Sequence, residues 1–458
     1  MTPEDNNSKF NEFRERFPYF IYESCEYSVA ENSLDIRFKF DLGGKYLFNP
    51  SIRIPLSDFY DLKNVPDAAL ENIIFHIGMV ELISYWKAAC PPIVIIKPFR
   101  LDEAQVRWWK NLYFNGLGEF FYLNGIAADI ETFVNISSES EKRLLKFEMP
   151  LDESYIVPVG GGKDSVVTLE LLKNKYSVTP LVINPRKATS ECIQAAGFSK
   201  NDCIEIFRTI DPLLLELNAQ GFLNGHTPFS ALLAFVSLLT GVLSKKRNIA
   251  LSNECSANET TVIGQNINHQ YSKSYEFEKD FREYVSMYIN EGLNYFSFLR
   301  PLHEIQIAYL FSMFPQYFQV FKSCNAGSKT DIWCCNCPKC LFSFIILSPF
   351  ISPDDLIIIF GENLLDKQSL LPVFNQLIGV GDVKPFDCIG TIEEVKNALF
   401  MSMEKYTNRL PFLLKEFAEN TICEKSQDLS LGKWMNVFDN KNFLNDCDLQ
   451  IIKIALSC

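Results

Sequence analysis

Residues 151–350 alternate short apolar segments with segments of helical periodicity, and this alternation constrains the fold more than any other feature. Parallel strands need a crossover between them, and a helix is the usual crossover. We therefore predict an α/β fold with a central parallel sheet and helices on both faces. Strands are predicted at Tyr155–Val159, Leu181–Ile183, Cys203–Phe207 and Asn248–Leu251, and helices at Ser165–Leu172, Thr189–Ala196 and Phe229–Leu243.

Two further regions flank this alternation. Residues 1–150 are predicted to form an α+β domain, because alternating apolar segments up to Phe48 surround a Leu42-Gly43-Gly44 turn and are followed by helical patterns. Those helices are predicted at Asn72–Ala89 and Asp102–Phe114. Residues 351–458 are predicted to be mainly helical. Within them, Gly379–Thr391 is unusually polar and glycine-rich, but the sequence assigns it no chemistry.

Composition narrows the class of protein. The chain has 458 residues, of which 47% are hydrophobic, so it can bury a substantial core over two or three domains. Its net charge of −13 disfavours nucleic acid as a partner, because a phosphate backbone repels such a surface. The first fifteen residues do not resemble a signal peptide, and the apolar stretch around Ala231–Leu243 is too short to span a bilayer. We expect a soluble cytoplasmic protein with no membrane partner.

Three glycines and a polar triplet join the first predicted strand to its helix. Tyr155–Ser165 reads YIVPVGGGKDS, in which Gly160, Gly161 and Gly162 are followed by Lys163, Asp164 and Ser165. Consecutive glycines let backbone N–H groups curl around an anion, and a helix N-terminus adds partial positive charge. Lys163 would add a full charge, and Ser165 could cap the helix or bond a phosphate oxygen. The spacing excludes the Walker loop and the dinucleotide fingerprint. A tight turn without a ligand is the simpler alternative.

A second polar segment, Leu251–Phe277, follows the last predicted strand. Ligands of open α/β sheets bind at the carboxyl ends of the strands, so this segment is expected beside the glycine loop. Glu254 could ligate Mg²⁺ or act as a base, and His269 and Lys273 could meet phosphate or transfer protons. A solvated surface loop is the alternative.

Five of the fourteen cysteines fall between Cys324 and Cys340. In a chain without an export signal, such a cluster points to metal chemistry rather than to disulfides. Cys334, Cys337 and Cys340 make two successive C-x2-C steps, and Cys324 lies ten positions upstream. Four thiolates at this spacing suit a closed, structural Zn²⁺ site. Cys335 could replace Cys334, and an iron–sulfur cluster or unmetallated thiols remain alternatives.

The other three histidines are weaker signals. His76 lies in an apolar helical pattern and is expected to be a hydrogen-bonded core or interface residue. His226 precedes Thr227-Pro228, where helix capping is the simplest interpretation. His303 follows Arg300-Pro301, where Arg300 could hold a carboxylate but a surface pair is expected.

The glycine loop resembles the S-G-G-x-D-S motif of the PP-loop ATP pyrophosphatases, with Gly160 in place of the first Ser. The resemblance implies that ATP is cleaved between its α and β phosphates, that the loop holds those phosphates, and that Asn184, at the end of the next strand, meets the nucleoside. The deazaguanine-synthesising branch of these enzymes has a similar cysteine knuckle, and this supports zinc.

Longer stretches resemble a family of epimerases that act on UDP-N-acetylmuramoyl-L-alanyl-L-glutamate in bacterial peptidoglycan synthesis. They are FHIGMVELISYWKAACPP (Phe75–Pro92), GLGEFFYLNGI (Gly116–Ile126), VPVGGGKDS (Val157–Ser165), SNECSAN (Ser252–Asn258), NHQYSKSYEFE (Asn268–Glu278), CNCPKCLFSF (Cys335–Phe344) and KPFDCIGTIEE (Lys384–Glu394). The resemblance implies an isomerase of cell wall biogenesis, and hence of cell shape, that uses ATP and Mg²⁺. It would invert the terminal L-Glu of the UDP-muramoyl dipeptide to D-Glu and release AMP and pyrophosphate.

Such a reaction needs a proton acceptor and a proton donor on opposite faces of the α-carbon. The sequence offers Glu254, Cys255, His269, Tyr271, Lys273 and Glu119 as candidates, while Lys163 and Asp164 would act on the phosphates. Two other functions stay open. One is a PP-loop enzyme that adenylates a base or RNA, and the other is a nucleotide-binding protein without turnover. The sequence does not indicate an oligomeric state.

Overall fold

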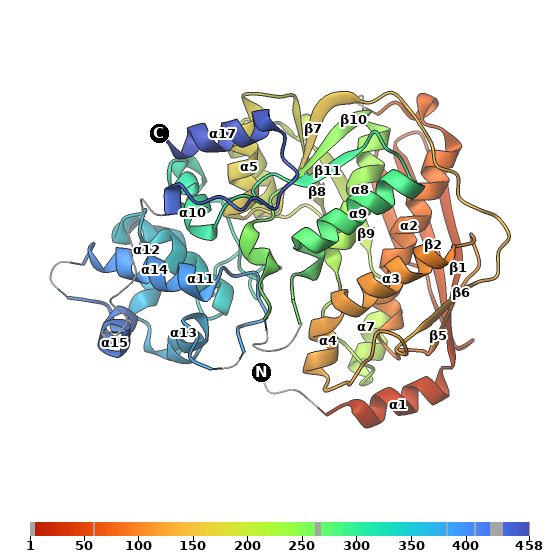
Figure 1. Ribbon diagram of the computed structural model, residues 1–458, viewed down its shortest axis with the longest axis horizontal. Coiled ribbons are helices and arrows are strands. Elements are labelled where there is room, and N and C mark those ends of the chain that lie inside the picture. The colour runs from red at the N-terminus through yellow and green to blue at the C-terminus, as the bar shows by residue number, and fades with distance from the viewer. Residues whose placement is uncertain are drawn as a thin grey trace.

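A computed structural model describes residues 5–57, 60–261, 267–381, 383–406, 409–421 and 434–457. Within these residues, one sheet of eleven strands runs in the order β11-β10-β7-β8-β9-β4-β2-β1-β5-β6, and β3 pairs with β2. The N-terminal strands lie at the right of Figure 1 and the helical C-terminal region at the left, with the parallel strands between them. The protein is therefore a mixed α/β fold with one large central sheet.

The strands after residue 150 form the parallel half of this sheet, as predicted. Neighbours β11-β10-β7-β8-β9 all pair in parallel. Helix α8 (Phe229–Leu243) has the predicted bounds. The other elements here are β7 (Asp152–Pro158), α5 (Lys163–Lys173), β8 (Val178–Ile183), α6 (Lys187–Ala195), β9 (Ile204–Thr209), α7 (Pro212–Ala219), β10 (Lys246–Leu251), α9 (Tyr275–Tyr288) and β11 (Asn294–Ser297).

The N-terminal strands join the same sheet rather than building a separate one. The predicted turn at Leu42-Gly43-Gly44 joins β2 (Ser33–Leu42) to the antiparallel strand β3. Strand β2 also pairs antiparallel with β1 (Tyr19–Val29), and β4 (Ser51–Pro55) pairs antiparallel with β9. The sheet is consequently mixed, whereas a parallel one was predicted. The pairing also crosses residue 150, the predicted boundary between the first two domains. The remaining elements are α1 (Asn7–Arg16), β3 (Tyr46–Phe48), α2 (Asp67–Trp86), β5 (Ile93–Ile96), α3 (Glu103–Gly116), α4 (Gly118–Leu123) and β6 (Asn135–Ser138).

Helices cover both faces of the parallel strands. Successive strand residues point to opposite faces, and the two hydrophobic cores follow this period. Ile156 and Ile249 belong to a core with α2, α3 and α8, whereas Val157 and Ala250 belong to a core with α5 and the C-terminal helices. These strands are therefore buried on both sides, which explains their continuous apolar sequence.

Helix α2 is the only helix in the described part of the chain that is long and apolar enough to cross a membrane by length and composition, and 89% of its apolar window is buried inside the fold. Its His76 is fully buried. The His76 Nδ1 atom lies 2.7 Å from the carbonyl oxygen of Asn72, and Nε2 lies 2.8 Å from the hydroxyl of Tyr284. Because the carbonyl can only accept, Nδ1 carries a proton, and burial lowers the pKa of His76 to about 4, so the ring is neutral at pH 7. The prediction of a hydrogen-bonded core histidine is confirmed.

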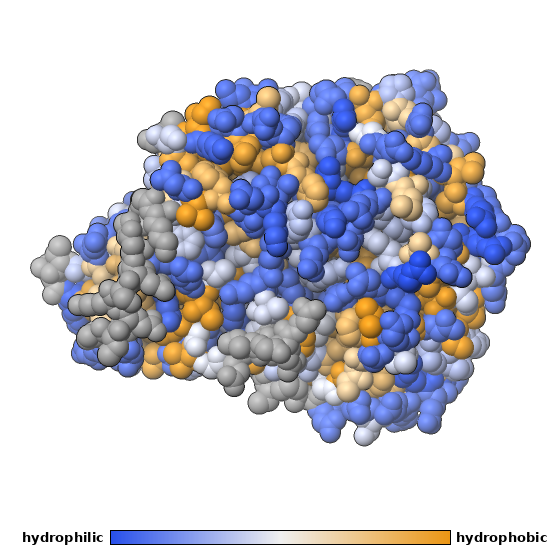
Figure 2. Space-filling model, in the orientation of Figure 1, coloured by the Kyte–Doolittle hydropathy of each residue, from blue (hydrophilic) through white to orange (hydrophobic). Residues whose placement is uncertain are grey.

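The described residues from 351 onwards are mainly helical, as predicted, and the two preceding helices, α10 and α11, pack with them. This region packs against α5 through α10 and α17, and Figure 1 shows α17 lying beside α5. Figure 2 shows polar side chains over most of the visible face, with small apolar patches between them. The helices are α10 (Glu304–Ser312), α11 (Pro338–Leu347), α12 (Pro353–Phe360), α13 (Leu371–Leu377), α14 (Ile392–Met403), α15 (Phe412–Thr421) and α17 (Asp446–Leu456).

Candidate active site

The glycine loop connects β7 to α5 at the carboxyl edge of the parallel strands, where it was predicted. Gly161 has a φ of +83°, and a Cβ atom on Gly162 would lie 2.5 Å from the Ser323 hydroxyl oxygen. A Cβ atom on Gly160 would meet nothing within 4 Å. The backbone N–H of Lys322 donates to the Gly161 carbonyl at 2.8 Å. Backbone conformation thus favours glycine at position 161, and the close approach of Ser323 favours it at position 162. Lys322 and Ser323, in the segment that leads to Cys324, contact the loop.

A cavity of about 600 Å³ opens over this loop. Ser165 and Asn184, both predicted for this site, line it, although the Ser165 hydroxyl donates to the Gly162 carbonyl at 3.0 Å. The Asn184 side chain is bonded to the backbone of Arg208 in both directions, at 2.8 and 3.0 Å, and this fixes the end of β8. Apolar side chains line another part of the cavity and suit a flat base. They include Val159, Leu181, Ile183, Phe229, Leu233 and Tyr295.

The charge around the cavity is opposite to that of the whole chain. Four cationic side chains line it, and Asp164 is the single carboxylate among the described lining residues. Such an excess of positive charge in a cleft attracts polyanions. The sequence predicted only Lys273 of these four, because the others come from separate loops and helices. The cations are Arg186, Lys273, Lys322 and Lys339.

Three carboxylates meet beside the loop. One oxygen each of Asp164, Glu254 and Glu304 lies within 4.8 Å of the others, and the ammonium group of Lys163 pairs with both Asp164 and Glu304. The Lys163 side chain is only 5% exposed and its ammonium group is held by these carboxylates, so its action on the phosphates stays a prediction. Burial raises the pKa of Asp164, but Lys163 and Lys339 outweigh burial and lower it. Carboxylate oxygens are preferred Mg²⁺ ligands, so this cluster fits that ion.

A second cluster joins the N-terminal half of the chain to the C-terminal region. The Lys273 ammonium donates to the Cys388 sulfur at 3.0 Å, and His269 Nδ1 lies 2.5 Å from a Glu119 carboxylate oxygen. Burial lowers the pKa of His269, but hydrogen bonds to Cys388 and Glu119 outweigh burial and raise it to about 9. Glu119, His269, Cys388 and Lys273 thus form one hydrogen-bonded chain. Cys388 lies in the polar segment 379–391, to which the sequence assigned no chemistry.

His226 also belongs to this cluster. Its Nδ1 atom lies 3.6 Å from the Glu119 carboxylate, and its ring centroid lies 4.6 Å from that of His269. The expected capping role is therefore replaced by a place beside Glu119. His226, His269 and Glu119 are far apart in the sequence, so no local sequence pattern predicts that they contact one another.

Cys255 is not part of either cluster. Its sulfur lies 3.2 Å from His303 Nδ1 and faces a separate cavity of about 1060 Å³. That cavity is larger, but its lining is acidic and repels phosphate. Its carboxylates are Glu259, Glu276, Asp280, Glu393 and Asp439, against Lys279 and Lys441. Tyr271 lines it too, and the Tyr271 hydroxyl accepts a bond from Asn111 at 2.9 Å.

Arg300 fixes the backbone of the polar segment Leu251–Phe277 through buried hydrogen bonds. It is fully buried, pairs with Glu278 at 2.9 Å, and donates to the carbonyls of Glu254 and Lys273 at 2.7 and 2.5 Å. The expected surface pair is wrong, because Arg300 instead fixes the backbone that carries two site residues. Residues 262–266 of the predicted polar segment lie outside the described residues.

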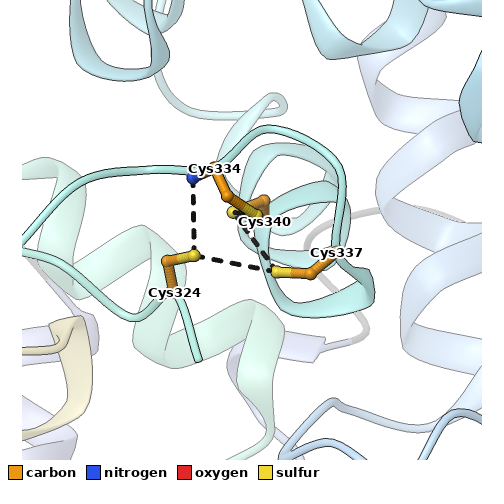
Figure 3. A group of neighbouring side chains, drawn as sticks. All are labelled: Cys324, Cys334, Cys337 and Cys340. Atoms are coloured by element: carbon orange, nitrogen blue, oxygen red, sulfur yellow. Dashed lines mark hydrogen bonds between the residues drawn. The ribbon is translucent and has the colours of Figure 1, made fainter. Parts of the chain in front are cut away.

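The four predicted cysteines converge ahead of helix α11 (Figure 3). Their sulfur–sulfur distances are 3.9 Å for Cys324–Cys337, 3.8 Å for Cys334–Cys340 and 3.5 Å for Cys337–Cys340. A tetrahedral zinc ion with bonds of roughly 2.3 Å needs sulfurs about 3.8 Å apart, so the donor set fits. Cys335 donates instead to the Phe360 carbonyl at 3.1 Å, which removes it as the alternative to Cys334.

The fold is that of an α/β protein with a cationic ligand cavity at the carboxyl ends of its parallel strands. Acidic and thiol side chains lie at this cavity, as in an enzyme active site. The sequence matches the MurL N-terminal domain over residues 11–298 and the MurL C-terminal domain over residues 320–430. The chain belongs to the MurL family, which confirms the resemblance drawn from its motifs.

Three curated relatives carry the name UDP-N-acetyl-alpha-D-muramoyl-L-alanyl-L-glutamate epimerase. The Micromonospora sp. protein is 33% identical over 86% of this chain and 89% of its own length. The Xanthomonas oryzae pv. oryzae protein is 30% identical over 83% and 84%. The Salinispora tropica protein is 33% identical over 74% of each. No solved structure matches the chain.

Proposed function

We propose that this protein is an ATP-dependent epimerase that inverts the terminal L-Glu of UDP-N-acetylmuramoyl-L-alanyl-L-glutamate through an acyl-adenylate. The names of its relatives support the substrate and the epimerisation. The observation that carries the ATP half-reaction is the glycine loop, which opens onto a cavity lined by four cations. The product would enter peptidoglycan synthesis in the cytoplasm.

Within this proposal, the cavity binds ATP with its phosphates at the glycine loop, in the manner of the PP-loop enzymes. Free backbone N–H groups of the loop and the N-terminus of α5 meet the phosphate oxygens. Arg186, Lys273, Lys322 and Lys339 surround the same space and neutralise the triphosphate. The apolar part of the cavity, beside Ile183, receives the adenine.

Adenylation would solve a specific chemical problem. A free carboxylate makes its own α-hydrogen hard to remove, because the carbanion would form beside a negative charge. Transfer of AMP to the α-carboxylate oxygen cancels that charge and releases pyrophosphate. A base can then take the α-proton and an acid can return one on the other face. Water finally hydrolyses the acyl-adenylate to AMP and the D-Glu product.

Two metal ions complete the proposal. Asp164, Glu254 and Glu304 would hold Mg²⁺, which would supply positive charge against the phosphates. The four-cysteine site would hold a structural Zn²⁺ with no open position. Its place next to residues 322–323 links zinc to the shape of the glycine loop, since Cys324 directly follows the serine that contacts Gly162.

The test is incubation with ATP, Mg²⁺ and the UDP-muramoyl dipeptide that ends in L-Glu. We expect AMP, pyrophosphate and a D-Glu product in equal amounts. Asp164→Asn should lower pyrophosphate release roughly 100- to 1000-fold, because it removes one preorganised charge at the phosphoryl site. Asp202→Asn, at an exposed carboxylate ahead of β9, is the matched control and should leave the rate unchanged.

Each alternative function predicts a different outcome. Release of ADP, or no nucleotide cleavage, would contradict the epimerase. AMP formed only with an RNA or a deazaguanine-type acceptor would indicate another adenylating enzyme. ATP binding without AMP would indicate a nucleotide-binding protein without turnover.

A further inference from the structure

Cys388 contacts two other parts of the chain, the polar segment after β10 through Lys273 and helix α11 through Lys339. Its side chain lines the same cavity as the glycine loop and Lys273, so it faces the space where the activated glutamyl group would form. It is half-buried, and its backbone carbonyl accepts a hydrogen bond from Lys339 of α11. The thiol is thus both accessible from the cavity and held in position.

The groups around the Cys388 thiol are mostly cationic. Lys273, at the end of a short helical turn, donates to the sulfur at 3.0 Å, and His269 hydrogen-bonds to it from the preceding loop. Lys339 approaches from α11. The neighbouring carboxyl of Asp387 is engaged by Asn325. The carboxylate of Asp164 also faces Lys273.

This environment stabilises a thiolate. Burial alone would raise the pKa of Cys388, but Lys273, His269 and Lys339 outweigh burial and lower the pKa to about 6. Cys203, which is also half-buried but lacks such partners, has a pKa raised by burial to about 12. Nearby cations are the usual cause of a reactive thiolate.

The other residues considered for proton removal are less suitable. Lys273 and His269 are both protonated at neutral pH, since the pKa of each is raised. Glu254 belongs to the carboxylate cluster, and its backbone is fixed by Arg300. Cys255 faces the acidic cavity, where burial and Glu394 raise the pKa of its thiol.

We propose, on the basis of the proposed function, that the Cys388 thiolate is the catalytic base that removes the α-proton of the adenylated glutamyl residue, with Lys273 and His269 as its positioning residues. The Cα–H bond breaks and an S–H bond forms, and the electron pair moves onto the acyl oxygen as an enolate. A proton delivered from solvent to the opposite face restores the Cα–H bond. Cys388 then loses its proton to water and returns to the thiolate.

The decisive experiment separates adenylation from inversion. Cys388→Ala should keep substrate-dependent ATP–pyrophosphate exchange near the parental rate, because the phosphate-binding residues are untouched. The same variant should lose D-Glu formation and solvent-deuterium entry at the α-position by roughly 100- to 10,000-fold, the usual contribution of a general base. Cys203→Ala is the matched control and should retain both activities.

Two outcomes would overturn the assignment while leaving the proposed function intact. One is parental deuterium entry in Cys388→Ala. The other is a glutamyl thioester on Cys388 of the parent protein, with AMP release lost in the variant, which would make the thiol a nucleophile instead. A parent protein that releases no pyrophosphate with the dipeptide would contradict the proposed function itself.

A second measurement needs no turnover. Site-resolved alkylation with iodoacetamide should modify Cys388 with a midpoint near pH 6, and Lys273→Gln should move that midpoint upward. Cys203 in the same samples should react only at much higher pH. A Cys388 midpoint at pH 8 or above would contradict the proposal, whatever the fate of the variants.

Discussion

The hydroxyl oxygen of Ser323 stands 2.5 Å from the point where a Cβ atom of residue 162 would lie, so this hydroxyl keeps its place against the loop because residue 162 is glycine. Ser323 directly precedes Cys324, the first cysteine of the metal-type cluster. Lys322, on its other side, bonds the Gly161 carbonyl at 2.8 Å. The segment that leads into the cysteine cluster is therefore packed against and hydrogen-bonded to the glycine loop.

The three glycines should respond differently to substitution. Gly162→Ala should turn the Ser323 hydroxyl away from the loop and lower stability by about 1 kcal/mol or less, with a loss of pyrophosphate release, because the Ser323 Cβ atom would lie at 3.8 Å. Gly160→Ser should leave thermal stability and pyrophosphate release unchanged, because the space beside Gly160 is open. Thermal denaturation and a pyrophosphate assay check both. An inactive Gly160→Ser beside an active Gly162→Ala would contradict this account of the loop.

Metal content should follow the cysteine geometry. We expect one zinc ion per chain by elemental analysis of freshly purified protein. Cys337→Ser should lose it, whereas Cys335→Ser should keep it, because the Cys335 thiol bonds the Phe360 carbonyl instead. Since the knuckle holds the loop, Cys337→Ser should also slow pyrophosphate release. Metal-free parent protein, or equal zinc loss in both variants, would refute the assignment.

Removal of the Lys163 charge should cost stability as well as activity. Lys163→Met leaves the buried carboxylate of Glu304 and the partly buried carboxylate of Asp164 without their ammonium partner. Breaking such a buried pair typically costs about 3–5 kcal/mol, which urea denaturation would measure. Lys187→Met, which removes an exposed pair with Glu191 at 3.7 Å, is the control and should cost at most about 0.5 kcal/mol. Equal unfolding free energies for both variants would show that Lys163 is not held as described.

His76 should make stability depend on pH in a defined window. Burial lowers the pKa of His76 to about 4, while the same side chain in the unfolded chain titrates near its ordinary pKa of 6.5. Below about pH 6.5 the unfolded state therefore binds the proton first, and the parent loses up to about 3 kcal/mol by pH 4. His76→Gln lacks this loss, so the difference in unfolding free energy between parent and variant should shrink as pH falls. A constant difference between pH 7.5 and 4.5 in urea denaturation would contradict it.

Local pattern was sufficient for much of the fold. The β–α alternation after residue 150, the N-terminal hairpin and the bounds of α8 all followed from periodicity and turn residues, which act over a few positions. The four-residue strands β5, β6 and β11 were not predicted. The union of both sheet halves was missed as well, since β4 and β9 pair across about 155 positions.

The same distinction applies to the candidate site, where short motifs were predicted and contacts between distant residues were not. The glycine loop and the four cysteines are compact motifs, and both were found at the predicted residues. The sequence also marked Glu254, His269 and Lys273, but it could not show which of them meet. Cys388 was missed although the polar, glycine-rich character of residues 379–391 was visible. That character and the resemblance of Lys384–Glu394 to the epimerase family were the two signals available.

The sequence by itself determined the alternation of strands and helices after residue 150, the glycine loop, the four-cysteine cluster and the family of this protein. Each of these depends on residues that are close together in the chain. Tertiary structure alone decided that Lys163 serves two carboxylates, that Arg300 is buried beneath the polar segment, and that Lys273 and His269 surround Cys388. The state of an ionisable group depends on burial and on charges within a few ångströms, and those neighbours come from any part of the chain.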